Sequence, residues 1–210
     1  VGSYSRDKSF LSGLIRSETS MIAAQYLSLS SIGIPYMGIG RNLSYKKELF
    51  FNNKGFATHM ALMSGDDDLF INEVAHGKNT AIAFDADTQT SSIPESSWKN
   101  WLEQKRRHLT TSIRYNPLSM IALGIQTMAS YAFYALSILA MFTFSQFIWI
   151  FFIIPIFWIL TILGYYPLYK RMKHIDALIW IPLTDIFILF FYPAAYLHNL
   201  ILSGNPWKNY

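Results

Sequence analysis

Two polar clusters in the first half of the chain contain the residue types that a group-transfer site requires. The first is the run SGDDDLFINE at 64–73, where three consecutive aspartates stand at the predicted start of a helix. A carboxylate there can accept a proton from a hydroxyl group at neutral pH. The second is the run QKRRH at 104–108. Its Gln104, Arg107 and His108 share one helical face, and Arg107 can bind two oxygens of a departing diphosphate at once.

Each cluster also has a simpler interpretation. Acidic residues at a helix start complement the helix dipole, and no glycine follows where an EF-hand loop requires one. A basic helix beside a membrane can bind anionic lipid without taking part in catalysis. A further pair, Asp85 and Asp87, follows the apolar run TAIAF with the spacing of an oxygen-ligated metal site. For this pair we favour a solvated loop.

Charged residues are distributed unevenly along the chain. Residues 1–118 hold 13 of the 17 Lys and Arg and 11 of the 13 Asp and Glu, whereas no such residue occurs between Ser119 and Tyr169. The sequence therefore predicts a water-facing half followed by a membrane region. The net charge of +4 comes without a basic stripe interleaved with aromatic residues, which argues against a nucleic-acid partner. The absence of cysteine excludes disulfides and thiolate metal sites.

Three apolar stretches in the second half approach or exceed the roughly 20 residues that cross a bilayer; they are 119–142, 147–167 and 178–202. The basic loop KRMKH at 170–174 predicts a cytoplasmic position for itself and for residues 1–118. Pro182, Asp185 and Pro193 interrupt the third stretch, which leaves a kinked span, an interfacial helix and a re-entrant segment as alternatives. Asp185 is expected to face other helices or a polar cavity.

Local patterns predict the elements that must position the two clusters. Apolar periodicity, turn residues and capping residues predict a helix at 8–30, a strand or loop at 36–45, a helical turn at 46–51, a helix from a Ser64 cap to about 76, a strand at 80–84, and a helix at 98–111 capped by Ser97. The aspartates and the QKRRH run then lie on two different helices.

The order of these motifs resembles the C-terminal half of bacterial membrane-bound family 2 glycosyltransferases, in particular those of Bacteroidetes-type bacteria. The matching segments span the chain up to the membrane: YMGIGRNLSYKKELFF with KGF, SGDDDLFINE, the SIPES loop and WKNWLEQKRRH. The resemblance implies an α/β fold. Residues 1–118 would be the C-terminal part of a cytoplasmic GT-A domain, mostly helical with a few short strands. Residues 119–210 would form a transmembrane α-helical region.

The resemblance also implies roles for individual residues. The family's general base falls on Asp66, with Gly65 where glutamate is usual, and its Gln-x-x-Arg-Trp motif falls on residues 104–108, with His108 in place of tryptophan. The substrate-binding residues implied in this way are Gly40, Arg41, Asn42, Asp68, Gln104, Arg107 and His108. The metal-binding DxD of the family precedes the base, so it is expected before residue 1 rather than at Asp85–Asp87.

The activity implied is inverting transfer of a sugar from a nucleotide-sugar donor to a lipid-linked or polysaccharide acceptor, at the cytoplasmic face of the bacterial inner membrane. A divalent metal, Mg²⁺ or Mn²⁺, is the expected cofactor, and membrane lipids are expected partners. We expect residues 1–210 alone to be inactive because the donor-binding half would lie upstream. The alternatives are a non-catalytic membrane transport or assembly subunit and a truncated, inactive glycosyltransferase.

Overall fold

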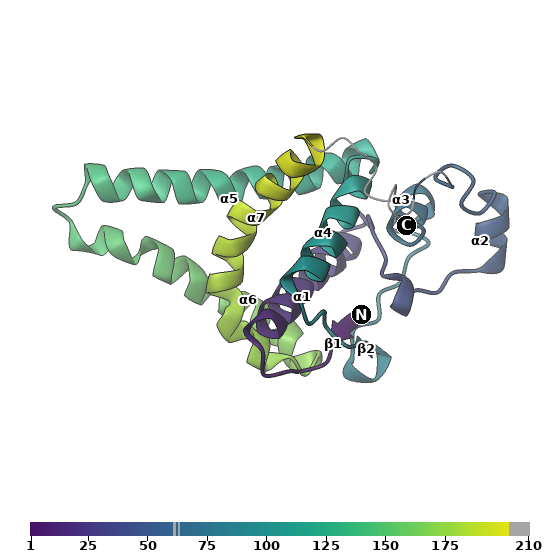
Figure 1. Cartoon of the computed structure of the whole chain (residues 1–210), viewed down its shortest axis with the longest axis horizontal. Helices are drawn as coiled ribbons and strands as arrows, with labels where there is room; N and C mark the ends of the chain where they lie inside the picture. The colour runs from purple at the N-terminus through teal and green to yellow at the C-terminus, as the bar shows by residue number, and fades with distance from the viewer. Residues whose placement is uncertain (61, 63, 202–210) are drawn as a thin grey trace.

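The computed structural model describes residues 1–60, 62 and 64–201, and within them the protein is mostly helical (Figure 1). In chain order its main elements are β1 (Gly2–Tyr4), α1 (Phe10–Ser31), α2 (Lys47–Asn52), α3 (Asp68–Val74), β2 (Thr90–Ser92), α4 (Trp98–Ser112), α5 (Pro117–Thr143), α6 (Ile153–Arg171) and α7 (Ile181–Ile201). Short 3₁₀ segments lie at Gly40–Asn42, Ala86–Thr88, Ile148–Phe152 and Ile175–Trp180.

Helix α1 is the main packing element of residues 1–118, the half of the chain that the sequence predicts to face water and that is called the water-facing half below. Ser9 caps its start by accepting a hydrogen bond from the amide of Ser12 at 3.2 Å. Gly33 follows its end with φ near +90°, a conformation that favours glycine and stops the helix. The side chains of Leu14 and Ile15 are buried against Trp101 of α4. Burial of this apolar face stabilises α1 more than its own helix propensity does.

Helix α4 carries the QKRRH run and forms as the sequence predicts. Ser97 caps it by accepting a hydrogen bond from the amide of Asn100 at 3.2 Å. Trp101 is fully buried, with the ring of Phe191 stacked on it at 5.2 Å and Phe187 at 5.5 Å. Since both phenylalanines belong to α7, the last helix of the membrane region packs directly on the water-facing half.

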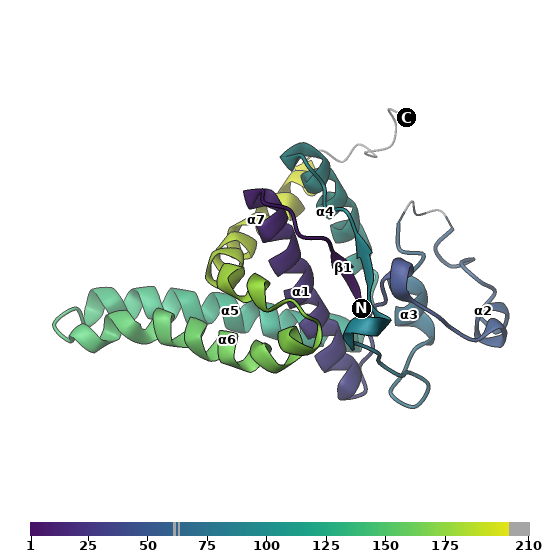
Figure 2. The same ribbon diagram turned by 90° about the horizontal axis from the view of Figure 1, so that it is seen from below.

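Three helical segments are long and apolar enough to cross a membrane: Pro117–Thr143, Ile148–Arg171 and Ile175–Asn199. These bounds replace the stretches expected at 119–142, 147–167 and 178–202. Helices α5 and α6 form a hairpin that extends away from the rest of the molecule, whereas α7 crosses its base and runs beside α1 and α4 (Figures 1 and 2). Helix α7 continues through Pro193.

Asp185 faces other helices, as its position in an apolar stretch predicts. Its carboxylate accepts a hydrogen bond from the hydroxyl of Tyr134 on α5. The same hydroxyl accepts one from the indole of Trp158 on α6 at 3.0 Å. The two hydrogen bonds of the Tyr134 hydroxyl therefore link α5, α6 and α7.

The strand predicted at 80–84 is wrong, whereas the loop alternative for 36–45 is confirmed. Residues 80–84 form no regular strand, and the segment 36–45 is irregular around the 3₁₀ turn Gly40–Asn42. The described strands are β1 and β2, a short parallel pair in which Gly2 faces Thr90. Partners so distant in sequence leave no local pattern, which explains why the prediction missed them.

Candidate functional site

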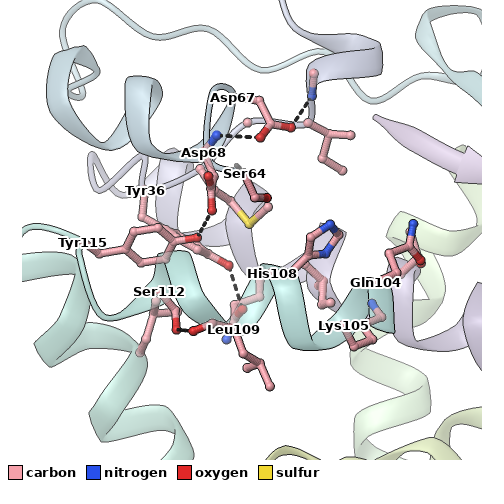
Figure 3. Close-up of a pocket in the computed structure, with 18 of the residues that line it drawn as sticks. Tyr36, Ser64, Asp67, Asp68, Gln104, Lys105, His108, Leu109, Ser112 and Tyr115 are labelled. Carbon is pink, nitrogen blue, oxygen red and sulfur yellow. Dashed lines mark hydrogen bonds between the residues drawn. The ribbon is translucent and has the colours of Figure 1, made fainter. Parts of the chain in front are cut away.

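A cavity of about 460 Å³ lies where the water-facing half meets the membrane helices (Figure 3). Its walls come from α1, the segment 36–41, the start of α3, and α4, with Leu123 of α5 and Tyr192 of α7 completing it. The polar residues among them include Gln25, Arg41, Asp67, Gln104, Lys105 and His108. Segments far apart in the sequence thus contribute side chains to one space.

The three consecutive aspartates have three different environments. Asp66 is exposed and precedes the helix. Asp67 lines the cavity, and its two carboxylate oxygens accept hydrogen bonds from the amides of Gly40 at 2.6 Å and Asp68 at 2.9 Å. Asp68 is buried. Asp67 therefore caps α3 in place of the expected Ser64, because Gly65 with φ near +105° turns the chain between them.

Asp68 joins α3 to the end of α4 and the start of α5. One carboxylate oxygen accepts hydrogen bonds from the hydroxyls of Thr111 and Tyr115, both at 2.7 Å. Figure 3 shows the bond from Tyr115. The other accepts one from the amide of Leu69 at 2.9 Å. Burial and the nearby Asp68 carboxylate raise the pKa of Tyr115 well above its usual range, so this phenol stays a donor.

The Gly40–Asn42 turn closes one side of the cavity. A Cβ at Gly40 would stand 3.2 Å from the Asp67 carboxylate, so a side chain there would disturb the close approach. Arg41 lies over the ring of Tyr4, with its guanidinium carbon 4.3 Å from the centroid. The Asn42 side chain donates to the carbonyls of Val1 at 2.9 Å and Thr88 at 2.7 Å, which fixes the turn to its neighbours.

The α4 wall of the cavity contains a buried charge pair that the sequence did not reveal. The ammonium group of Lys105 lies 2.5 Å from one carboxylate oxygen of Glu18, and the hydroxyl of Tyr192 donates to the other at 2.5 Å. Glu18 is 1% exposed and Lys105 8% exposed. A glutamate within the apolar pattern of α1 was the available signal, but its partners lie on α4 and α7.

His108 is open to water within the cavity although protein surrounds most of its ring. This enclosure, together with the nearby charge of Lys105, lowers the pKa of His108 to about 4. The imidazole is therefore neutral at pH 7, with one nitrogen able to donate and the other to accept. A neutral ring adds no positive charge to the cavity.

We expect His108 to make the protein less stable as the pH falls from about 6.5 toward 4. Between these pH values the His108 side chain binds a proton in the unfolded chain but not in the folded protein. The free energy of unfolding therefore decreases as the pH falls. The check is the thermal midpoint at about pH 7 and about pH 5, compared with the His108→Gln variant. The thermal midpoint of the wild type should fall further between these two pH values than that of the variant. Equal losses would contradict the expectation.

The cavity brings together five of the eight residues that the resemblance implies: Gly40, Arg41, Asp68, Gln104 and His108. Asp66 stands next to the lining residue Asp67 without lining the cavity itself. Asn42 lines a neighbouring cavity. Arg107 is half-buried on α4 and is not part of the lining. Lys105 and Tyr192 also line the cavity, and Glu18 lies behind them in contact with both; the sequence reasoning identified none of the three.

Among the described residues, no three His, Asp or Glu side chains gather into a metal-binding group. Asp85 of the DAD sequence is exposed and pairs with Arg171 at 3.2 Å. These residues do not provide a metal centre by themselves.

Comparisons with known proteins identify no relative: no family model, curated protein or solved structure matches the chain. The residues of the cavity are therefore the basis for inferring a function.

Proposed function

We propose that the protein is part of a membrane-bound glycosyltransferase, in which it forms the acceptor side of the sugar-transfer site. The observation that carries this proposal is the convergence of the Gly40–Asn42 turn, the aspartate run and the α4 polar face on one cavity. Motifs that were unrelated in function would not be expected to line the same cavity. Fold-level likeness does not establish function, so the proposal rests on these side chains.

In the proposed reaction an acceptor hydroxyl attacks the anomeric carbon of a nucleotide-sugar. The new glycosidic bond forms as the bond to the diphosphate oxygen breaks, and the configuration inverts. Asp66 takes the hydroxyl proton. Asp67 and Asp68 are held by hydrogen bonds to amides and hydroxyls, whereas Asp66 is exposed, which supports Asp66 as the carboxylate available to the acceptor.

Gln104 and Arg107 are assigned to the departing diphosphate, as the resemblance implies. A guanidinium group can bind two phosphate oxygens in parallel, and the Gln104 amide offers a further donor. Arg41 and His108, which line the cavity, are assigned to the path of the sugar and acceptor. The divalent metal of such a transfer, Mg²⁺ or Mn²⁺, has no ligand set among the described residues, so none of them is assigned to it.

We also propose that the protein resides in the bacterial inner membrane with residues 1–118 in the cytoplasm. The basic loop 170–174 supports this orientation, since such loops are enriched on the cytoplasmic side. The loop lies against the water-facing half, where the Gln89 amide donates to the carbonyl of Met172 at 3.1 Å. Arg16 of α1 also binds Asp176 just beyond the loop at 2.5 Å.

The direct test is transfer from radiolabelled nucleotide-sugars by membranes that contain the natural full-length protein. We expect Gln104→Ala to raise the KM for the donor about tenfold, because it removes one hydrogen bond to a charged group. Asn100→Ala, at an exposed position on the same helix, is the matched control and should change nothing. Folded protein that transfers no sugar from any donor would support a non-catalytic membrane subunit instead.

A further inference from the structure

Helices α5 and α6 pack on each other through the rings of Phe133 and Phe157 and expose apolar side chains on their outer faces. On α5 these include Ile121, Ile125, Met128, Leu136, Leu139 and Phe142. The first turns of α5 are tied to the water-facing half through Ser119, which accepts from Asn72 at 3.2 Å, and Gln126, which accepts from Gln25 at 2.8 Å. The remaining segment 127–143 is about 25 Å long at 1.5 Å per residue, close to the thickness of a bilayer core.

Helix α7 differs from α5 and α6 because one of its sides packs along α4. Trp101 of α4 packs on Phe187 and Phe191. Near the end of α7, Asn199 accepts from the guanidinium of Arg106 at 2.8 Å and donates to the Arg106 carbonyl at 3.2 Å. In the most apolar 18-residue stretch of each candidate span, 22% of the residues are buried for the span that contains α7, against 11% for that of α5 and 6% for that of α6.

Another side of α7, adjacent to the one that packs on α4, is an exposed apolar stripe. Its residues within α7 follow one another at intervals of three, four, seven and four positions, which places them on one side of the helix; they are Leu183, Ile186, Phe190, Leu197 and Ile201, and the exposed Ile179 of the preceding 3₁₀ segment extends the stripe. A helix with protein on one side and such a stripe on another matches a helix that lies in the membrane interface.

The charges of α4 decide between an interfacial and a spanning position for α7. Lys99 and Glu103 are exposed on α4, which runs beside α7 from Phe187 to Asn199. If α7 crossed the bilayer in this packing, α4 and its ionised side chains would enter the hydrocarbon with it. Charged side chains without partners are strongly disfavoured there.

We infer that α7 lies in the membrane interface, with its Ile179–Ile201 stripe toward the lipid, and that of the described helices only α5 and α6 cross. The direction of α7 across the base of the hairpin fits this arrangement (Figures 1 and 2). The end of α7 is then on the same side of the membrane as residues 1–118. The inference does not depend on sugar transfer.

The absence of cysteine allows a test by single-cysteine labelling. Glu103→Cys reports the side of the water-facing half, Ser145→Cys the hairpin turn, and His198→Cys the end of α7; all three positions are exposed. In sealed vesicles of one orientation, a membrane-impermeant maleimide should label His198→Cys from the same side as Glu103→Cys. It should label Ser145→Cys only from the other side.

Labelling of His198→Cys from the Ser145 side would overturn the inference in favour of three spans. Failure to label Ser145→Cys from the far side would contradict the crossing of the hairpin. A depth measurement with spin labels is independent of sidedness. A label at Phe190 should lie near the interface and a label at Leu136 near the middle of the bilayer. Equal depths would also overturn the inference.

Discussion

The Asp66→Asn variant is expected to transfer sugar about 10²–10⁴-fold more slowly than the wild type, the usual contribution of a general base. The amide has nearly the shape of the carboxylate but does not accept the acceptor proton. Because Asp66 is exposed, the substitution should leave the fold and membrane insertion unchanged. The measurement is kcat for transfer in membranes, with protein amount and folding checked in the same samples.

Two matched variants sharpen the Asp66 experiment. Asp87→Asn changes an exposed carboxylate in the Ala86–Thr88 turn, away from the cavity, and should keep full activity. Asp67→Asn removes a carboxylate that lines the cavity and holds the amide of Gly40. If Asp67→Asn abolished transfer in a folded protein while Asp66→Asn kept it, the base would be Asp67 and our assignment would be wrong.

The Glu18→Ala variant is expected to lower the free energy of unfolding by about 3–5 kcal/mol, the usual cost of removing one partner of a buried ion pair. Lys105 would then be a buried charge without its carboxylate, and the Tyr192 hydroxyl would lose its acceptor. The loss should appear in denaturant unfolding in detergent micelles. A loss below about 1 kcal/mol would match an exposed pair and contradict the buried arrangement.

A double variant separates the charge from the packing. In Glu18→Leu with Lys105→Met, both charges are replaced by apolar side chains of similar size. Such replacement of a buried pair is often neutral or stabilising, but the Tyr192 hydroxyl still loses its acceptor, so the double variant should be more stable than Glu18→Ala and fall below the wild type only by about 1–3 kcal/mol, the cost of an unsatisfied buried group. Stability as low as that of Glu18→Ala would show that shape, rather than the unpaired charge, causes the loss.

Local features of the structure were largely predictable from the sequence. The limits of α1 and α4 follow from apolar periodicity and from Ser97, whose capping bond is formed as expected. The three apolar stretches correspond to the three candidate spans. The start of α3 was not predictable to the residue, because the conformation of Gly65 decides whether Ser64 or Asp67 caps the helix.

Features that depend on distant residues were not predictable. Glu18 and Tyr192 are 174 residues apart in the chain, so no local pattern reveals their hydrogen bond. The packing of α7 also depends on distant residues: its apolar run predicts a span, and its contacts with Trp101 and Arg106 of α4 reveal a protein-facing side. In the site, sequence order indicated Gln104 and His108 but gave no sign of Lys105 beside them.

The junction between residues 115 and 119 bears on how the protein can be produced. Tyr115 donates to Asp68, Asn116 donates two hydrogen bonds to Asn72, and Asn72 in turn donates to Ser119. A chain ended at residue 118 to obtain a water-soluble catalytic fragment would lose Ser119 from this network. It would also lose the α7 rings that cover Trp101. Purification and crystallisation therefore call for detergent or nanodiscs and for the helices through α7.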